Sequence, residues 1–227
     1  MYAIIYEFLR ALKVENCVHT IVTHSASSHL ALQLVAEKKE ICKAVVLLAP
    51  MPLQPHKAIR PWCIIKFLNF LWKFNWLKRP LRLFYAAYAY ALKRFTGIRF
   101  DHSANHSEVD VFASSVEISA NWDFESSRKQ ANILRERTNF PVVILYGRKD
   151  NLVQTKLSQE LCDCLGVPLR AHLLCRNDSD DSLLQRIGQL KSEGVSKFAI
   201  GFENEGHFIQ SPKAALIVAI CKLFGSK

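Results

Sequence analysis

The stretch Val18-His-Thr-Ile-Val-Thr-His-Ser-Ala-Ser-Ser28 decides the fold of this 227-residue chain. Its first five residues are rich in β-branched side chains, which is typical of a short strand. Small residues follow from Thr23 to Ser28, and Leu30, Leu34 and Val35 then recur at helical spacing. The order of elements is therefore strand, sharp turn and helix.

Three further apolar segments have the composition of strands that are buried on both faces of a parallel sheet. They are Ala44–Ala49, Val142–Tyr146 and Lys197–Phe202. Helical patterns lie between them, and another runs from Tyr2 to Val14 ahead of the first strand. We therefore expect an α/β fold with a mostly parallel sheet that is flanked by helices.

The interval from Leu53 to Phe140 is too long for one crossover between neighbouring strands. It holds a basic, aromatic-rich segment and then a helical stretch around residues 109–118, and its pattern predicts no strand. We expect residues 53–140 to form an inserted helical cap. Residues 1–52 and 141–227 would then be the two parts of the sheet domain.

The cysteines and the N-terminus indicate the compartment. The seven cysteines form neither CxxC pairs nor a zinc-like pattern with histidine, which favours reduced thiols and a cytoplasmic location. We expect neither a metal nor an organic cofactor. The N-terminal segment has no basic region, and Glu7 interrupts its apolar stretch, so it does not resemble a signal peptide. No apolar run reaches the ~20 residues that a membrane-spanning helix needs.

Ser25 is the first candidate for chemistry, because it lies in the turn of Thr23-His-Ser-Ala-Ser27 between a strand and a helix. This is the context in which a G-x-S-x-G turn holds a serine hydroxyl clear of a strained backbone. Ser27 meets the need for small flanking residues, and Thr23 meets it poorly. The backbone N–H of Ala26 could serve as an oxyanion donor at the helix N-terminus. The alternative is that Ser25 merely caps the helix.

Asp150 and His207 each follow another predicted strand, in Tyr146-Gly-Arg-Lys-Asp150 and Glu203-Asn-Glu-Gly-His207. Carboxyl ends of parallel strands meet at one edge of a sheet, so both side chains should lie near Ser25. Taken singly, each is more typical of a loop residue. Together, the chain order Ser, Asp, His favours a catalytic triad.

Three segments carry a family resemblance: Thr23-His-Ser-Ala-Ser27, Pro141-Val-Val-Ile-Leu-Tyr-Gly-Arg-Lys-Asp150 and Asn204-Glu-Gly-His-Phe208. They resemble the corresponding segments of the α/β-hydrolase superfamily, and the resemblance spans essentially the whole chain. Pro55-His-Lys-Ala-Ile-Arg-Pro61 and Asn204-Glu-Gly-His-Phe-Ile-Gln210 further resemble a branch found in nematodes and related worms. That narrower resemblance implies no substrate.

The resemblance implies roles for the candidate residues. Ser25 would attack an acyl carbonyl, His207 would take up and return the proton, and Asp150 would orient the imidazole. The family's first four strands, with the loop that gives a second oxyanion N–H, would precede Met1. We therefore expect an N-terminally truncated α/β-hydrolase fold whose nucleophile strand lies at a sheet edge, and an activity that is reduced or absent.

The formal charge of +10 is concentrated between Ile41 and Phe100, which contain eleven Lys/Arg and no Asp or Glu. Half of the chain's 24 aromatic residues lie between Pro61 and Phe100. Such a segment can lie in a membrane interface, or its aromatics can pack in a cap while its charges are solvated. Nucleic-acid binding is disfavoured, because no zinc finger, RNP or glycine-rich phosphate motif is present.

We therefore expect a serine hydrolase that acts on an ester-like, apolar acyl substrate through Ser25, Asp150 and His207. We expect a small-molecule acyl substrate as its partner, with peripheral membrane contact through the cap as an addition. The alternative is a catalytically inactive hydrolase-fold protein that binds lipid or a protein partner through the basic aromatic cap.

Overall fold

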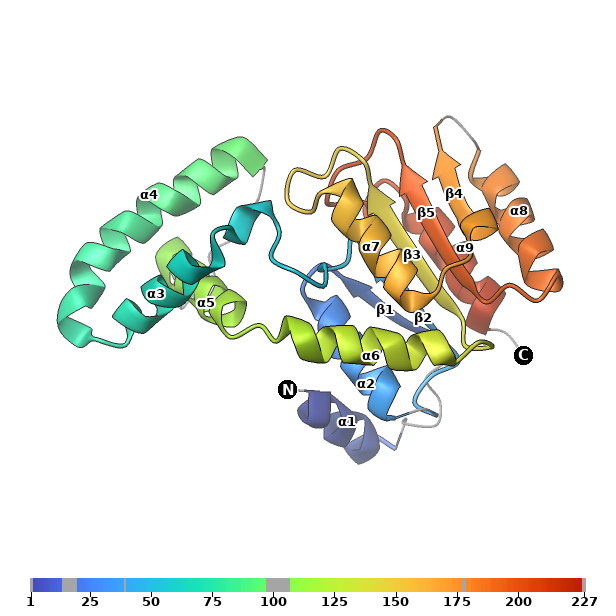
Figure 1. The fold of residues 1–227 in the computed structure, drawn as a ribbon, viewed down its shortest axis with the longest axis horizontal. Coiled ribbons are helices and arrows are strands. Elements are labelled where there is room, and N and C mark those ends of the chain that lie inside the picture. Colours follow the sequence, from blue (N-terminus) through green and yellow to red (C-terminus); the bar gives the residue numbers. More distant parts are fainter. Residues whose placement is uncertain (1, 14–19, 39, 97–106, 177–178, 226–227) are drawn as a thin grey trace. The chain divides into compact units, whose positions relative to one another are not determined.

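The computed structural model describes residues 2–13, 20–38, 40–96, 107–176 and 179–225. Its five strands form one sheet in which every neighbouring pair is parallel (Figure 1). In spatial order they are β1 (Thr20–His24), β2 (Ala44–Leu48), β3 (Val142–Gly147), β5 (Lys197–Phe202) and β4 (His172–Cys175). The predicted parallel sheet is confirmed, and β1 lies at one edge of it.

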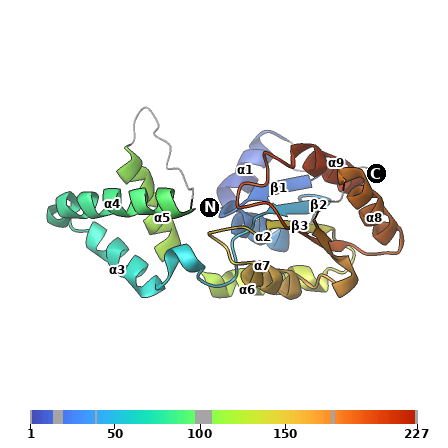
Figure 2. The same cartoon turned by 90° about the horizontal axis from the view of Figure 1, so that it is seen from above.

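The three central strands form the core of the sheet, because every residue of β2, β3 and β5 is buried. Val45 pairs with Val142 across β2 and β3, and Val143 pairs with Phe198 across β3 and β5. Helices cover both faces, with α6 and α7 on one and α8 and α9 on the other (Figures 1 and 2). The bounds of these helices are α6 (Phe124–Glu136), α7 (Thr155–Leu165), α8 (Asp180–Ser192) and α9 (Ala214–Gly225). Continuous apolar strands are what such double coverage requires.

Two N-terminal helices pack near the start of the sheet. Helix α2 (Ser27–Glu37) follows β1 directly and packs against β1 and β2, and α1 (Tyr2–Ala11) packs on α2. The helix expected up to Val14 therefore ends at Ala11 in the described part. Residues 18 and 19 of the first expected strand lie outside the described residues.

Strand β4 was not expected from the sequence. It has only four residues, and exposed Leu174 separates the buried Leu173 and Cys175, so no long apolar run marks it. It follows the short 3₁₀ helix η3 (Leu169–Ala171) and pairs with β5 at the edge opposite β1. A strand this short gives a weak periodic signal.

The chain divides into two compact units. The sheet unit comprises residues 1–53 and 125–227, and the helical unit comprises residues 54–124. The expected insertion extended to residue 140, whereas the contacts group residues 125–140 with the sheet. The physical reason is α6, whose Ala131 and Leu134 are fully buried in the main core.

The helical unit has its own core. Its elements are η1 (Lys57–Ile59), α3 (Trp62–Trp72), η2 (Asn75–Leu77), α4 (Lys78–Thr96) and α5 (Glu108–Ala120), and α5 packs against both α3 and α4. Tyr85 of α4 is fully buried and lies between the rings of Trp72, stacked at 5.0 Å, and Phe112, edge-on at 5.2 Å. Its hydroxyl donates a hydrogen bond to the carbonyl of Leu68 at 3.2 Å. None of the described helices is both long enough and apolar enough to span a bilayer.

Candidate active site

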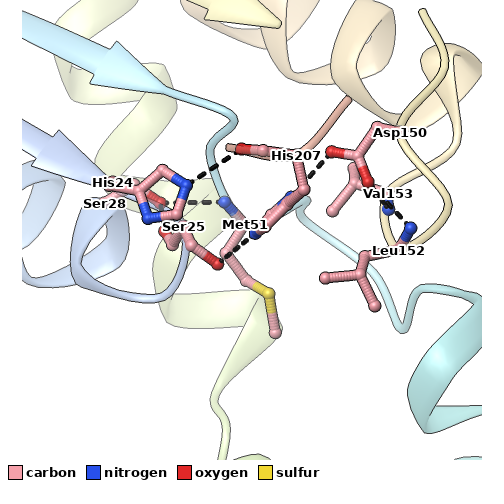
Figure 3. A network of polar contacts seen from close by, with 8 residues as sticks. All are labelled: His24, Ser25, Ser28, Met51, Asp150, Leu152, Val153 and His207. Carbon is pink, nitrogen blue, oxygen red and sulfur yellow. Dashed lines mark hydrogen bonds and ion pairs between the residues drawn. The ribbon is translucent and has the colours of Figure 1, made fainter. Parts of the chain in front are cut away.

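Ser25 stands at the carboxyl end of β1 in a left-handed backbone conformation with φ of +53°. A non-glycine residue rarely adopts this conformation, so the surrounding structure must hold it. The Ser25 N–H donates to the carbonyl of Leu48 at 2.9 Å. The Ser25 carbonyl accepts from the hydroxyl of Ser28 at 2.7 Å and from the N–H of Met51 at 3.2 Å (Figure 3). The turn is thus fixed on both sides of the serine, which leaves its half-buried side chain free to point elsewhere.

The side chain of Ser25 points to His207 and not to the helix that follows. Ser25 Oγ lies 2.9 Å from His207 Nε2. Ala26 occupies the N-cap position of α2, and no side chain forms a capping hydrogen bond there. The structure therefore does not use the Ser25 hydroxyl as a helix cap.

Asp150 completes a chain of hydrogen bonds with His207. Asp150 Oδ2 lies 2.7 Å from His207 Nδ1, and both side chains are almost fully buried, with 3% and 6% exposed. The other oxygen, Oδ1, accepts the backbone N–H groups of Leu152 at 2.7 Å and Val153 at 3.0 Å (Figure 3). The carboxylate is therefore held from its own loop and presents one oxygen to the imidazole.

The partners of His207 determine where its proton lies. A carboxylate can only accept, so Nδ1 carries the hydrogen and donates it to Asp150. In the neutral ring Nε2 is then a lone-pair acceptor, and the Ser25 hydroxyl donates to it. This is the arrangement in which an imidazole can remove the proton of an attacking serine.

The loops that carry Asp150 and His207 touch at Gly147. A Cβ built on Gly147 would lie 2.3 Å from the carbonyl oxygens of both Glu205 and Gly206. Only glycine allows the backbones to approach so closely. Lys149 N–H adds a 2.9 Å hydrogen bond to the carbonyl of Glu205. The positions of the acid and the base are therefore fixed by backbone contacts as well as by their side chains.

His24 also belongs to the site, and it was not among the residues predicted from the sequence. Its Nε2 lies 3.0 Å from the backbone carbonyl of His207 and donates to it, and the two imidazole rings are 5.0 Å apart. Burial lowers the pKa of His24 below its ordinary value, more strongly than the hydrogen bond to His207 raises it. A neutral His24 with hydrogen on Nε2 therefore anchors the histidine loop. Its place next to Ser25 was the only available signal.

The two flanking residues of the turn differ in their hydrogen bonds. Ser27 Oγ accepts the N–H of His24 at 3.2 Å and donates to the carbonyl of His24 at 2.8 Å, so it closes the turn. Thr23 Oγ1 is buried and has no hydrogen-bond partner among the described residues. The N–H of Ala26 has no protein acceptor in the described part of the chain, so it is available to a ligand.

Within the described ranges, no three His, Cys, Asp or Glu side chains gather in a group that could hold a metal ion. The side chains in line at this edge of the sheet are a hydroxyl, an imidazole and a carboxylate.

A family model, described as "Alpha/beta hydrolase of unknown function (DUF1057)", matches residues 4–224. The chain belongs to this α/β-hydrolase family. No curated protein sequence matches the chain significantly. Solved structures also match the chain. The three described next share so little sequence identity with it that they show the fold alone.

Three solved structures illustrate this similarity. An esterase from Exiguobacterium antarcticum is 12% identical, with a TM-score of 0.56, and the match covers 98% of this chain and 72% of that one. A 2-hydroxy-6-oxo-6-phenylhexa-2,4-dienoate hydrolase from Rhodococcus sp. strain RHA1 is 16% identical, with a TM-score of 0.55 and coverage of 96% and 66%. A monoacylglycerol lipase from Paleococcus ferrophilus is 15% identical, with a TM-score of 0.50 and coverage of 98% and 72%. The α/β-hydrolase fold that the sequence predicted is confirmed.

Proposed function

We propose that this α/β-hydrolase is a serine hydrolase that cleaves an ester-like, apolar acyl substrate through Ser25, His207 and Asp150. The observation that carries the proposal is the continuous chain from Ser25 Oγ to His207 Nε2 at 2.9 Å and from His207 Nδ1 to Asp150 Oδ2 at 2.7 Å. The strained backbone of Ser25 supports it, because strain of this kind gathers at functional sites.

In the first half of the reaction, Ser25 Oγ would attack the acyl carbon while its proton passes to His207 Nε2. Asp150 stabilises the imidazolium and holds its orientation. The carbonyl oxygen becomes an oxyanion, and the N–H of Ala26 is the donor nearest in sequence that is free to stabilise it. The tetrahedral intermediate then collapses, the C–O bond to the leaving group breaks, and His207 returns the proton to the departing alcohol.

In the second half, water would attack the Ser25 ester with His207 again as the base. The same proton route restores the Ser25 hydroxyl and releases the acid. No metal or organic cofactor takes part in this scheme, since a hydroxyl, an imidazole and a carboxylate complete the proton balance.

The test is labelling of the purified chain by a fluorophosphonate, which reacts only with an activated serine. We expect Ser25 to be labelled, and we expect Ser25→Ala and His207→Ala to abolish labelling while circular dichroism remains that of the folded chain. A folded chain that stays unlabelled would refute the proposal and favour a hydrolase-fold protein that binds without turnover.

The substrate class has a separate test. Hydrolysis of p-nitrophenyl esters with acyl chains of increasing length should improve as the chain lengthens if the acyl site is apolar. Equal turnover of acetate and longer esters would contradict the apolar part of the proposal and leave the serine mechanism intact.

A further inference from the structure

The helical unit leaves many of its aromatic residues outside its core. Its packing is completed by Tyr85, Trp72, Phe112 and the aliphatic residues around them. Large exposed apolar groups in such number are unusual on a surface that meets only water. The exposed aromatics are Phe67, Phe70, Phe74, Trp76, Phe84, Tyr90 and Phe95.

Helix α3 arranges three of these rings along one side. Phe67, Phe70 and Phe74 are spaced by three and four residues, so they follow one another along the helix and its C-terminal end. Their exposed fractions are 58%, 53% and 39%, and Phe70 meets Phe74 edge-on at 5.2 Å. The buried residues of α3, Ile65 and Leu68, lie on the opposite side. The outward side of this helix is therefore apolar.

A hollow of about 370 Å³ lies beside this row of rings. Lys66 and Lys73, one on each side of Phe70, line it with Asn69 and Asn121. Neither lysine forms an ion pair with a residue that the structure describes, and Lys66 Nζ lies 3.9 Å from the ring centre of Trp62. Two ammonium groups and two amides provide the donors that a phosphate group accepts from.

The helical unit as a whole is positively charged, like the two lysines that line the hollow. Its described residues include nine Lys/Arg and four Asp/Glu, and one of the acids, Asp110, pairs with Arg82 at 2.6 Å. Outward aromatics beside lysines on one helix are the pattern of a side that lies in the interface of a negatively charged bilayer.

We propose that the helical unit binds the surface of membranes that contain anionic phospholipid. The phosphate of a headgroup occupies the hollow between Lys66 and Lys73, and Phe67, Phe70 and Phe74 enter the boundary between headgroups and acyl chains. The binding does not depend on turnover at Ser25. A membrane that holds the protein in this way also concentrates acyl substrates near it.

The experiment is sedimentation of the full chain with phosphatidylcholine vesicles, prepared with and without phosphatidylserine. We expect binding that requires phosphatidylserine and that Ser25→Ala retains. Lys66→Gln with Lys73→Gln should weaken binding about 25-fold, since each cation near an anionic surface contributes roughly fivefold. Phe67→Ser with Phe70→Ser should also weaken it at least 10-fold, because burying each ring removes apolar surface from water.

Matched controls come from exposed residues of the sheet unit. Lys43→Gln with Lys156→Gln removes the same charge, and Leu169→Ser removes an apolar side chain that is 88% exposed. Both should bind vesicles within about twofold of the unchanged chain. The proposal is overturned if phosphatidylserine does not increase binding, or if the test variants and the control variants bind alike. It is also overturned if inorganic phosphate at moderate ionic strength releases the chain from the vesicles completely, because the hollow would then be a site for free phosphate.

Discussion

Gly147→Ala should disturb the candidate site without touching any of its three polar side chains. The added Cβ would lie 2.3 Å from the carbonyl oxygens of Glu205 and Gly206, whereas real contacts of this kind begin near 3.0 Å. The two loops must therefore separate by roughly 0.7–1 Å, because both obstacles are backbone atoms that cannot rotate away. His207 follows directly after the displaced pair, so its imidazole should move with them.

The expected size of the effect follows from that shift. A displacement of about 1 Å in a catalytic geometry lowers rate by about 100-fold, and overpacking of a close contact costs about 1–3 kcal/mol of stability. For a chain of this length, that loss corresponds to a fall in Tm of roughly 2–12 °C. The assay is the rate of fluorophosphonate labelling at Ser25, with Tm measured by circular dichroism on the same samples.

Gly206→Ala is the matched control. Among the described residues beyond its chain neighbours, a Cβ at Gly206 would meet one atom within 4 Å, the carbonyl oxygen of Lys149 at 3.7 Å, which is an ordinary contact. This variant should label within about threefold of the unchanged chain, since nothing needs to move. Labelling of a folded Gly147→Ala chain at the unchanged rate, or equal slowing by both variants, would refute the reasoning.

Three other predictions concern single side chains. Asp150→Asn should lower the labelling rate about 10³-fold or more, because the amide no longer stabilises the imidazolium of His207. Its Tm should change little, because the amide oxygen still accepts the N–H groups of Leu152 and Val153. The labelling rate and the melting curve are measured on one preparation. His29 should make the chain less stable in acid: burial lowers its pKa to about 4 from 6.5, so the stability present above pH 6.5 is lost as the pH falls toward 4, by about 2 kcal/mol at pH 5. Urea unfolding at pH 7.5 and pH 5 should show this loss, and His29→Gln, which keeps a polar group beside Ser127, should reduce it. Thr23→Val should stabilise the chain by about 1 kcal/mol, because the buried hydroxyl has no partner among the described residues; an unchanged or lower urea midpoint would contradict this.

The central strands could be predicted because their environment leaves a strong signal in the sequence. β2, β3 and β5 are buried along their whole length and are apolar throughout. The positions of Ser25, Asp150 and His207 could be predicted for a related reason. Each follows a strand, and in a parallel sheet those strand ends meet, so topology brings together residues that are 125 and 57 positions apart in sequence.

The other features depend on contacts that leave no local pattern. Helix α6 could not be assigned to the sheet unit, because an amphipathic helix does not reveal which surface its apolar side will meet. His24 was marked only by its place next to Ser25, since its function rests on one backbone carbonyl of a loop 183 residues away. Gly147 was visible only as the end of a strand, and its need to lack a side chain appears when the opposing loop is in place.

The helical unit interrupts the chain once, between β2 and β3, and this arrangement bears on how the protein folds. Val45 must pair with Val142 across the entire insertion. The free-energy cost of closing this long connection is about 1 kcal/mol higher than it would be without residues 54–124. The insertion has its own core and mostly local helical contacts, which form faster than long-range strand pairing. We therefore expect it to contract first, so that the central strands search for each other at the ends of a short folded tether and not of a long flexible chain.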